Sequence, residues 1–162
     1  MGQSLLVQLR RCLGDEGVLS DPADQAVYLN DWRGRYHGRA LAVVFPQSTA
    51  QVAEIVRLCM AAGTPIVPQG GNTRMNRIRE IDAGNFSITA EAGATLDDLK
   101  LAADGVDRLY PLTLGAGHQS TLGGTLSTNA GGLQVLRYGM TREHCLGLEV
   151  VLPDGSIWSK LG

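Results

Sequence analysis

The sequence predicts an α/β or α+β fold in which the strands run in mixed directions. Two observations favour this fold class, and the length bounds the number of domains. Stretches with helical spacing of apolar residues alternate with short apolar or alternating runs that are typical of strands. A Pro-Asp-Gly turn at residues 153–155 lies between two strand-like runs, at 146–152 and 156–161, and predicts a hairpin. The length of 162 residues suits one domain with its own core.

The N-terminal elements are a helix and a polar loop. Leucines recur at helical spacing between residues 5 and 13, so this stretch predicts a short amphipathic helix. The Asp21-Pro22 pair interrupts the pattern. Residues 30–38 are polar and aromatic with interspersed glycines, which indicates a loop.

A strand–helix–strand unit is expected next. Residues 40–45 form a continuous apolar run that ends at Pro46, as in a strand buried on both faces. Ser48 and Gln51 have the spacing of a capping box and begin a helix that ends near Gly63. Residues 64–68 form a second short apolar run. We therefore expect a right-handed βαβ unit with a parallel strand pair.

A further strand and helix follow in the middle of the chain. Residues 86–91 alternate between apolar and polar side chains, which predicts a strand. Thr95 and Asp98 form another helix-start signal. The buried stripe expected on this helix consists of Leu96, Leu99 and Ala103.

Composition excludes several classes of protein. Apolar residues make up 44% of the chain, charged residues 19%, and the net charge is −2, so a basic surface for nucleic acid is absent. The apolar runs are far shorter than a membrane-spanning helix, and the first residues do not resemble a signal peptide. Cys12, Cys59 and Cys145 are widely spaced and form no CxxC motif. We therefore expect a cytoplasmic protein without a metal site or disulfide framework.

Glycine is the unusual residue, with 21 copies. The first glycine-rich loop, residues 68–73, follows directly after a predicted strand. Adjacent glycines at 70 and 71 free the backbone to point successive N–H groups into one concavity that binds an anion. Asn72 and Thr73 add side-chain donors at the same place. A plain loop is the alternative interpretation.

The second glycine-rich loop spans residues 115–132 and contains two Gly-Gly pairs that are eight residues apart. Such a segment packs a poor core, and each glycine inside a helix costs about 1 kcal/mol relative to alanine. We therefore expect backbone that approaches a ligand closely. Two anion-binding loops would suit a pyrophosphate, and hence a dinucleotide. Other phosphate-binding motifs are not present: Gly115 and Gly117 begin a GxGxxG pattern, but Ser120 stands at its last glycine, and GxxxxGK[ST] does not occur. The hydrolase motif GxSxG is also missing.

Four stretches together resemble a known family. They are YLNDWRG (28–34), PQSTAQVAEIVRLCMAAGTPIVPQGGNT (46–73), EAGATLDDL (91–99), and the segment from GAGHQSTLGG to LPDGS (115–156). The combination resembles the FAD-binding PCMH-type domain of the vanillyl-alcohol-oxidase superfamily. Within it, the chain is most similar to the FAD-linked D-lactate and D-2-hydroxyglutarate dehydrogenases. The resemblance covers most of the chain from about residue 21.

The resemblance implies two small α/β subdomains that hold FAD between them. We expect the N-terminal helix and its following loop at 1–39, the first subdomain at 40–82, and a partial second subdomain at 83–162. In the family, a D-2-hydroxy acid is oxidised by hydride transfer to FAD. The catalytic groups of relatives lie mainly in a C-terminal substrate domain, which we expect to be absent here, so no catalytic residue is assigned and this chain alone is expected to be inactive. The electron acceptor is left open, and a homodimer is compatible with the sequence.

The resemblance also implies which residues contact FAD. Gly70, Gly71, Asn72 and Thr73 match the pyrophosphate loop. Covalent members carry a flavin-linking histidine in this loop where this chain has Asn72, so non-covalent FAD is expected. The positions that match the second FAD-binding loop and the turn after it are Gly117, Thr121, Gly123, Gly124, Thr128, Asn129, Gly131, Gly132, Tyr138 and Gly139.

One departure from the family pattern supports an alternative. After Thr73 the chain continues directly into residues 74–82, and about twenty residues that relatives carry there are missing, at a place where exposed loops usually lie. A non-catalytic fragment or scaffold domain that no longer holds FAD is therefore the second hypothesis. A cell-wall UDP-N-acetylenolpyruvoylglucosamine reductase is the third, although the NAGG and RYG segments favour the dehydrogenases. Arg74, Arg77 and Arg79 are expected to form a solvated face.

Overall fold

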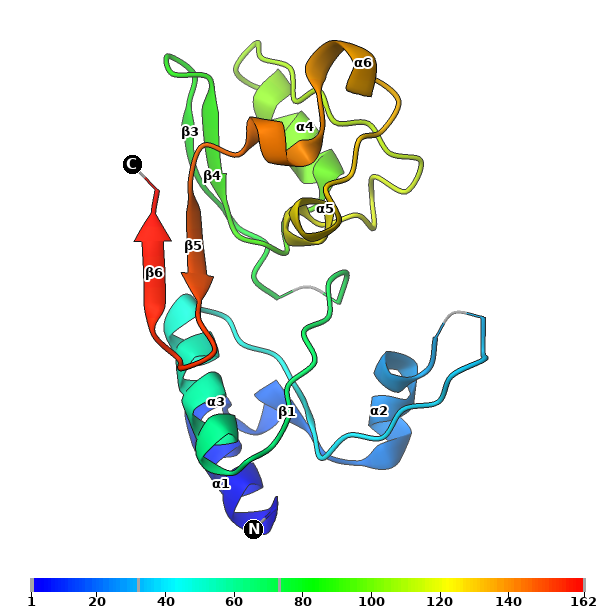
Figure 1. Ribbon diagram of the computed structural model, residues 1–162, viewed down its shortest axis with the longest axis vertical. Coiled ribbons are helices and arrows are strands. Elements are labelled where there is room, and N and C mark those ends of the chain that lie inside the picture. The colour runs from blue at the N-terminus through cyan, green and yellow to red at the C-terminus, as the bar shows by residue number, and fades with distance from the viewer. Residues whose placement is uncertain (1, 32, 73, 162) are drawn as a thin grey trace. The chain divides into compact units, whose positions relative to one another are not determined.

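The computed structural model describes residues 2–31, 33–72 and 74–161, and the chain divides into two compact units (Figure 1). The first unit comprises Met1–Val67 and Val150–Trp158. The second unit comprises Pro68–Glu149 and Ser159–Gly162. Each unit has its own cluster of buried apolar side chains.

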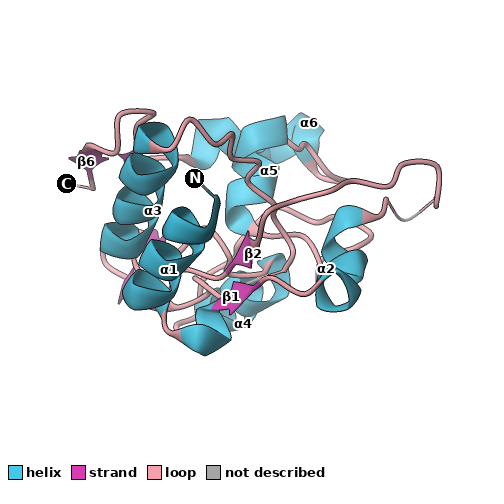
Figure 2. Cartoon of the chain, turned by 90° about the horizontal axis from the view of Figure 1, so that it is seen from below, coloured by secondary structure: helices cyan, strands magenta, loops and turns pink. Residues whose placement is uncertain are grey.

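The core of the first unit lies between two helices. The helices α1 (Gly2–Leu13) and α3 (Thr49–Ala61) lie side by side in Figure 2. A 3-10 turn, η1 (Asp15–Gly17), leads from α1 into a short antiparallel pair, β1 (Val18–Leu19) with β2 (Val43–Val44). The buried core side chains are Leu5, Leu9, Val18, Ile55 and Cys59. The predicted N-terminal helix is thus confirmed, and its leucines face α3.

Side-chain caps fix the starts of the two later helices of this unit. Asp21 caps α2 (Pro22–Leu29). At α3 the Ser48 hydroxyl accepts the Gln51 N–H at 3.3 Å, which confirms the predicted helix start. The Gln51 side chain does not return this bond to Ser48. It accepts the backbone N–H of Gln47 at 2.7 Å instead.

The expected parallel βαβ unit is wrong. Strand β2 pairs antiparallel with β1, and only residues 43–44 of the predicted strand at 40–45 are extended in a sheet. Residues 64–68 form no strand. Pro65 and Pro68 carry no N–H, so a continuous ladder cannot form across this short segment, and Val67 is 81% exposed.

The core of the second unit lies between a two-stranded ribbon and a helix. Strands β3 (Ile78–Asp82) and β4 (Ser87–Ala90) pair antiparallel, and β4 confirms the strand predicted at 86–91. Helix α4 (Leu96–Asp104) begins with the predicted signal, because Thr95 and Asp98 form a complete capping box. Its predicted stripe is buried throughout. The core side chains of this unit are Ala94, Leu96, Leu99 and Leu112.

The predicted C-terminal hairpin is confirmed. Strands β5 (Leu148–Val151) and β6 (Ile157–Lys160) pair around the Pro-Asp-Gly turn. The Leu152 N–H donates to the Ser156 carbonyl oxygen at 2.8 Å, and Gly155 supplies the positive φ of 77° that the turn needs. Across the described ranges, no helix combines the length and the apolar character needed to cross a bilayer.

Candidate functional site

The two glycine-rich loops lie next to each other within the second unit. A Cβ atom placed on Gly70 would lie 3.2 Å from Thr121 Oγ1 and 4.0 Å from the Cα of Gly124. A Cβ placed on Gly71 would lie 3.8 Å from the Gln119 carbonyl oxygen. The loops approach this closely because glycine at position 70 carries no side chain.

The first loop offers unpaired backbone donors. Gly71 has a φ of 89°, a conformation that favours glycine. The side-chain amide of Asn72 donates to the side-chain oxygen of Gln69 at 3.0 Å. Among the described residues, none accepts a hydrogen bond from the N–H of Gly70, Gly71 or Asn72. These residues are exposed. Such a loop can bind an anion through its backbone. Thr73, the remaining predicted member of the loop, lies outside the described residues.

The second loop contains a helix, α5 (Leu122–Thr128), where the glycine content predicts irregular backbone. Thr121 caps this helix. The hydroxyls of Ser127 and Thr128 donate to the carbonyl oxygens of Gly123 and Gly124, at 2.7 and 3.0 Å. Such bonds from a hydroxyl to the carbonyl oxygen four residues earlier satisfy the hydroxyls but do not stabilise a helix, so α5 depends on its cap and on bonds to other segments.

The Gly123-Gly124 pair is not a second anion-binding loop. The Gly123 N–H donates to the Ala92 carbonyl oxygen at 2.8 Å, and the Gly124 N–H donates to Thr121 Oγ1 at 3.3 Å. Both amides are therefore used inside the protein. A Cβ placed on Gly123 would lie 2.8 Å from the Cβ of Ala92, so this glycine allows a close approach of backbones. The two Gly-Gly turns therefore differ, because the Gly123 and Gly124 amides already have acceptors while those of Gly70 and Gly71 have none among the described residues.

The carboxyl end of α5 is held by an arginine that the sequence interpretation missed. Asn129 ends the helix in the left-handed conformation, with a φ of 51°. The Arg142 guanidinium donates to the carbonyl oxygens of Leu126 and Ser127, at 2.9 and 2.8 Å. The Arg142 N–H donates to Asn129 Oδ1 at 3.1 Å. A cation at a helix carboxyl end is favourable, but no local pattern links residues so far apart in the sequence.

The glycines after α5 fit tight backbone contacts. Gly132 has a φ of 73°, and a Cβ there would overlap the Thr113 carbonyl oxygen. Gly139 has a φ of 84°, and a Cβ there would overlap the carboxylate of Glu143. A Cβ on Gly131 would lie 2.8 Å from the sulfur of Met140. The positive φ at Gly132 and Gly139 therefore favours glycine whatever else these residues contact, while a side chain at Gly131 would have to displace Met140 or Val135.

The two other predicted residues lie at separate places in the unit. Gly117 is buried, and a Cβ there would lie 2.5 Å from the Asp97 carboxylate. Tyr138 is the last residue of helix α6 (Val135–Tyr138), with the Arg137 guanidinium 5.3 Å from its ring centre. A short 3-10 turn, η2 (Thr141–His144), follows and carries Arg142.

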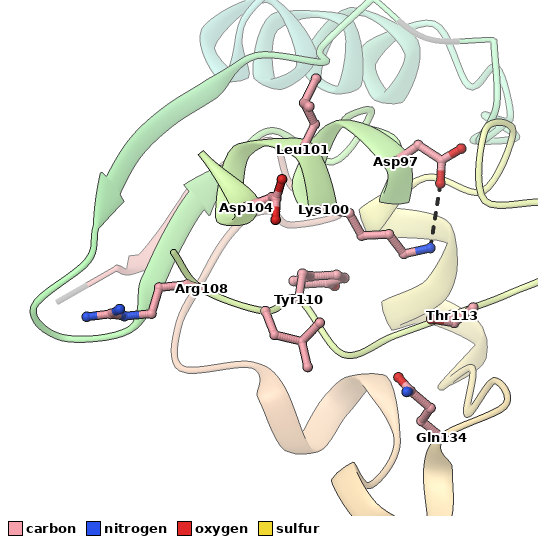
Figure 3. Close-up of a pocket in the computed structure, with 9 residues that line it drawn as sticks. Asp97, Lys100, Leu101, Asp104, Arg108, Tyr110, Thr113 and Gln134 are labelled. Carbon is pink, nitrogen blue, oxygen red and sulfur yellow. Dashed lines mark ion pairs between the residues drawn. The ribbon is translucent and has the colours of Figure 1, made fainter. Parts of the chain in front are cut away.

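A cavity of about 480 Å³ lies beside α4 (Figure 3). Asp97 and Lys100 form an ion pair in it at 3.6 Å, and Tyr110, whose pKa is raised by burial, also lines it. None of the predicted cofactor-binding residues lines this cavity. Its charges of both signs favour no ligand class. In the part of the chain that the structure describes, no group of three or more acidic, histidine or cysteine side chains is arranged to hold a metal ion.

Comparisons with known sequences point to one cofactor. The family described as FAD binding domain matches residues 72–159, more than half of the chain. The chain is 38% identical to a probable mitochondrial D-2-hydroxyglutarate dehydrogenase of Oryza sativa subsp. japonica, over 92% of this chain and 30% of that protein. It is 33% identical to a D-2-hydroxyglutarate–pyruvate transhydrogenase of Saccharomyces cerevisiae, over 96% of this chain and 36% of that protein. The chain thus spans about a third of the length of these relatives.

Comparisons with solved structures confirm the predicted fold class. An alkyldihydroxyacetonephosphate synthase superposes with a TM-score of 0.85 at 18% identity, over 98% of this chain and 34% of that chain. A p-cresol methylhydroxylase with substrate bound superposes with a TM-score of 0.75 at 21% identity, over 97% of this chain and 35% of that chain. At these identities the similarity concerns the fold alone.

Proposed function

Because this chain belongs to the FAD-binding domain family, whose cofactor is FAD, we propose that it is the FAD-binding part of a flavin-dependent oxidoreductase that oxidises a D-2-hydroxy acid. D-2-hydroxyglutarate and D-lactate are the substrates that we favour, because relatives are named as dehydrogenases of these two acids. The family match favours this proposal over a scaffold domain without a cofactor.

The meeting of the two glycine loops is the observation that carries the proposal. The unpaired backbone N–H groups of Gly70, Gly71 and Asn72 can donate to the pyrophosphate oxygens of FAD, and Gly70 lies directly against Thr121 Oγ1 and Gly124 at the start of α5. Backbone donors with positive φ glycine are the usual means of binding a phosphate without a cationic side chain. We place the pyrophosphate against this first loop. The predicted residues from Gly117 to Gly139, which shape the second loop and its turn, would line the rest of the cofactor.

The flavin and the protein residues have separate roles in the proposed reaction. When bound, the flavin supplies the hydride chemistry. The residues described here would bind and orient it, and none of them is assigned a catalytic role. We propose that FAD binds without a covalent bond to this loop. The side-chain amide of Asn72 is a poor nucleophile, and it already donates to Gln69 at 3.0 Å.

The wider organisation of the parent protein is also a proposal. We propose that FAD lies between two subdomains, at 40–82 and 83–162, which follow the N-terminal segment at 1–39, and that the 2-hydroxy acid binds through a further domain. A cytoplasmic location and a homodimer stay predictions of the sequence. Several relatives are named as mitochondrial.

A flavin-binding measurement tests the proposal. We expect the purified chain to quench the fluorescence of added FAD. The Gly70→Val substitution should weaken FAD binding by tenfold or more, because a side chain at this position would push the loop away from Thr121 Oγ1 and Gly124. An estimate of about tenfold corresponds to about 1.4 kcal/mol of binding free energy.

Gly105→Val is the matched control. Gly105 lies in the same unit, also without a positive φ, and a Cβ there meets only ordinary contacts at 3.5 and 3.6 Å. This variant should bind FAD as the unsubstituted chain does, with both variants folded by circular dichroism. A chain that takes up no FAD would favour the scaffold alternative, and equal FAD affinity in the two variants would contradict the loop assignment.

A further inference from the structure

The position of the Gly123-Gly124 pair depends on the backbone of residues 91–96. The Ala92 carbonyl oxygen accepts the Gly123 N–H at 2.8 Å, and the Ala94 carbonyl oxygen accepts the Leu122 N–H at 2.8 Å. The Leu96 N–H in turn donates to the Ser120 carbonyl oxygen at 3.0 Å. Whatever fixes this segment therefore also fixes the start of α5.

The sheet does not fix this segment by itself. The β3–β4 ladder has its last pair at Ile78 and Ala90, and the register shifts between Ile78 and Glu80. Beyond that pair the segment is bonded to residues 75–77. The Glu91 N–H donates to the Arg77 carbonyl oxygen at 2.9 Å, and the Gly93 N–H donates to the Met75 carbonyl oxygen at 2.6 Å.

A buried carboxylate reinforces this connection. Among the described residues, Glu91 is the one buried residue with a charged side chain, at 8% exposure. One of its oxygens accepts the backbone N–H of Arg77 at 2.9 Å. The other accepts the guanidinium nitrogens of Arg77 at 3.0 and 2.6 Å. Burying a carboxylate is costly unless it is paired and hydrogen-bonded, and Arg77 meets both needs.

The expected solvated face is confirmed, because Arg74, Arg77 and Arg79 are all exposed, but Arg77 and Arg79 also pair with acids. The Arg77 side chain is 69% exposed, but its donors are bonded to Glu91. Arg79 is also engaged, because its guanidinium pairs with Glu149 at 3.6 Å. Arg77 lies just before β3 and Arg79 lies within it, and the two arginines pair with different acids.

We propose that Glu91 is a positioning residue for the FAD site: its carboxylate, bound by Arg77, fixes residues 91–94 so that Gly123 stays against Ala92. The consequence is that Gly124 stays beside Gly70, which the meeting of the two loops requires. This inference rests on the proposed FAD site. Its structural part, the control of the α5 start by Glu91, can be measured without FAD.

The charges around Glu91 set the pH range of the effect. Arg77 lowers the pKa of Glu91 below its ordinary value of 4.5, chiefly by its side-chain hydrogen bond, then by its backbone N–H and its charge, with a smaller contribution from Arg79, while burial opposes the shift. A carboxyl with a lowered pKa in the folded state stabilises the fold above its unfolded pKa. That contribution is lost as the pH falls through the lowered value. The interaction is therefore complete at neutral pH and is lost only in acid.

Hydrogen exchange of the Leu122 and Gly123 amides tests the inference in the full chain without FAD. Protection factors correct for the intrinsic pH dependence of exchange. Glu91→Gln keeps the size of the side chain but removes its charge, so the protection of both amides should fall by about tenfold, as expected for loss of a charge-assisted hydrogen bond. When the pH falls through the lowered pKa of Glu91, the protection of the two amides should decrease in the unsubstituted chain. In the Gln variant, which has no carboxyl group at this position, the same change of pH should have a smaller effect.

Glu149→Gln is the matched control, because it removes an acid that pairs with the other arginine of the same ribbon. Its Leu122 and Gly123 amides should keep their protection. Arg77→Lys provides a second variant if Glu91→Gln does not fold, and it should reduce protection less, since lysine keeps the charge but not the forked donors. Unchanged protection in both Glu91→Gln and Arg77→Lys would overturn the inference.

The FAD affinity of Glu91→Gln separates this inference from the proposed function. If the unsubstituted chain binds FAD, the variant should bind it more weakly, while Glu149→Gln should not. If the unsubstituted chain binds no FAD, the proposed function fails, and loss of amide protection in Glu91→Gln still supports the role of Glu91 in holding α5. FAD affinity that is equal in Glu91→Gln and the unsubstituted chain would overturn the link between Glu91 and the cofactor site.

Discussion

Gly123 shows at the scale of one residue why the second loop is rich in glycine. A Cβ at this position would lie 2.8 Å from the Cβ of Ala92 and 3.1 Å from the Ala92 carbonyl oxygen. Contacts this short force the backbone to shift. The missing side chain therefore serves the packing of α5 against residues 91–94, and this packing brings Gly124 next to Gly70.

The Gly123→Ala substitution should destabilise the fold. Overpacking costs about 1–3 kcal/mol. Alanine gains about 1 kcal/mol over glycine inside a helix, so the net loss should be about 1 kcal/mol. Urea unfolding followed by circular dichroism measures it. Gly115→Ala is the control, because a Cβ there has nothing within 4 Å, and its unfolding free energy should change little. A Gly123→Ala variant as stable as the control would contradict the close-packing role.

Single residues also show what the sequence can and cannot predict. Local glycine excess correctly indicates where the backbone approaches another segment, since such positions exclude a Cβ. The bonds of Glu91 to Arg77 and of Arg142 to α5 have no such signal. Arg142 lies 15 or more residues from the carbonyl groups that it binds, and Arg77 meets Glu91 only through the register of the β3–β4 hairpin, so both partners are known only once the chain is folded.

Helix α5 is the element on which the candidate site depends. It has only seven residues, two of them glycine, and such a helix is marginal without support. Support comes from the Thr121 cap at one end and the Arg142 guanidinium at the other. The glycine count predicts a loop here, because propensity does not include these hydroxyl and guanidinium bonds.

The Arg142→Met substitution should loosen the carboxyl end of α5. It removes two donors to the carbonyl oxygens of Leu126 and Ser127, at a cost of about 1 kcal/mol for an exposed charge at a helix end. Thermal or urea unfolding measures the loss. Arg142→Lys should restore part of the stability through its charge. If Arg142→Met were as stable as the unsubstituted chain, the bonds to α5 would have no energetic role.

Elements with strong local signals were predicted correctly, and elements that depend on distant partners were not. The capping box of α4 and the Pro-Asp-Gly hairpin are fixed by neighbouring residues. The pairing of β2 is decided by β1, more than twenty residues earlier, and the prolines at 65 and 68 remove the expected parallel partner. Apolar runs alone do not reveal which strand will be the neighbour.

At the scale of the whole molecule, the two glycine-rich loops fold into one compact unit. Residues 68–149 contain the first loop, α5, and the Glu91–Arg77 connection that supports it. The fold is that of part of two larger enzymes, a p-cresol methylhydroxylase and an alkyldihydroxyacetonephosphate synthase, of which this chain spans about a third. The sequence resemblance predicts the fold class and the cofactor family correctly. The distribution of roles between the two loops required the hydrogen bonds of the structure.

The most direct test follows the backbone amides of Gly70, Gly71 and Asn72 by nuclear magnetic resonance while ligand is added to the full chain. FAD should shift these three resonances, because its pyrophosphate accepts their hydrogen bonds. Riboflavin, which carries the same flavin ring but no phosphate, should leave them in place. Resonances that do not move with FAD, or that move equally with riboflavin, would contradict a pyrophosphate site at the first glycine loop.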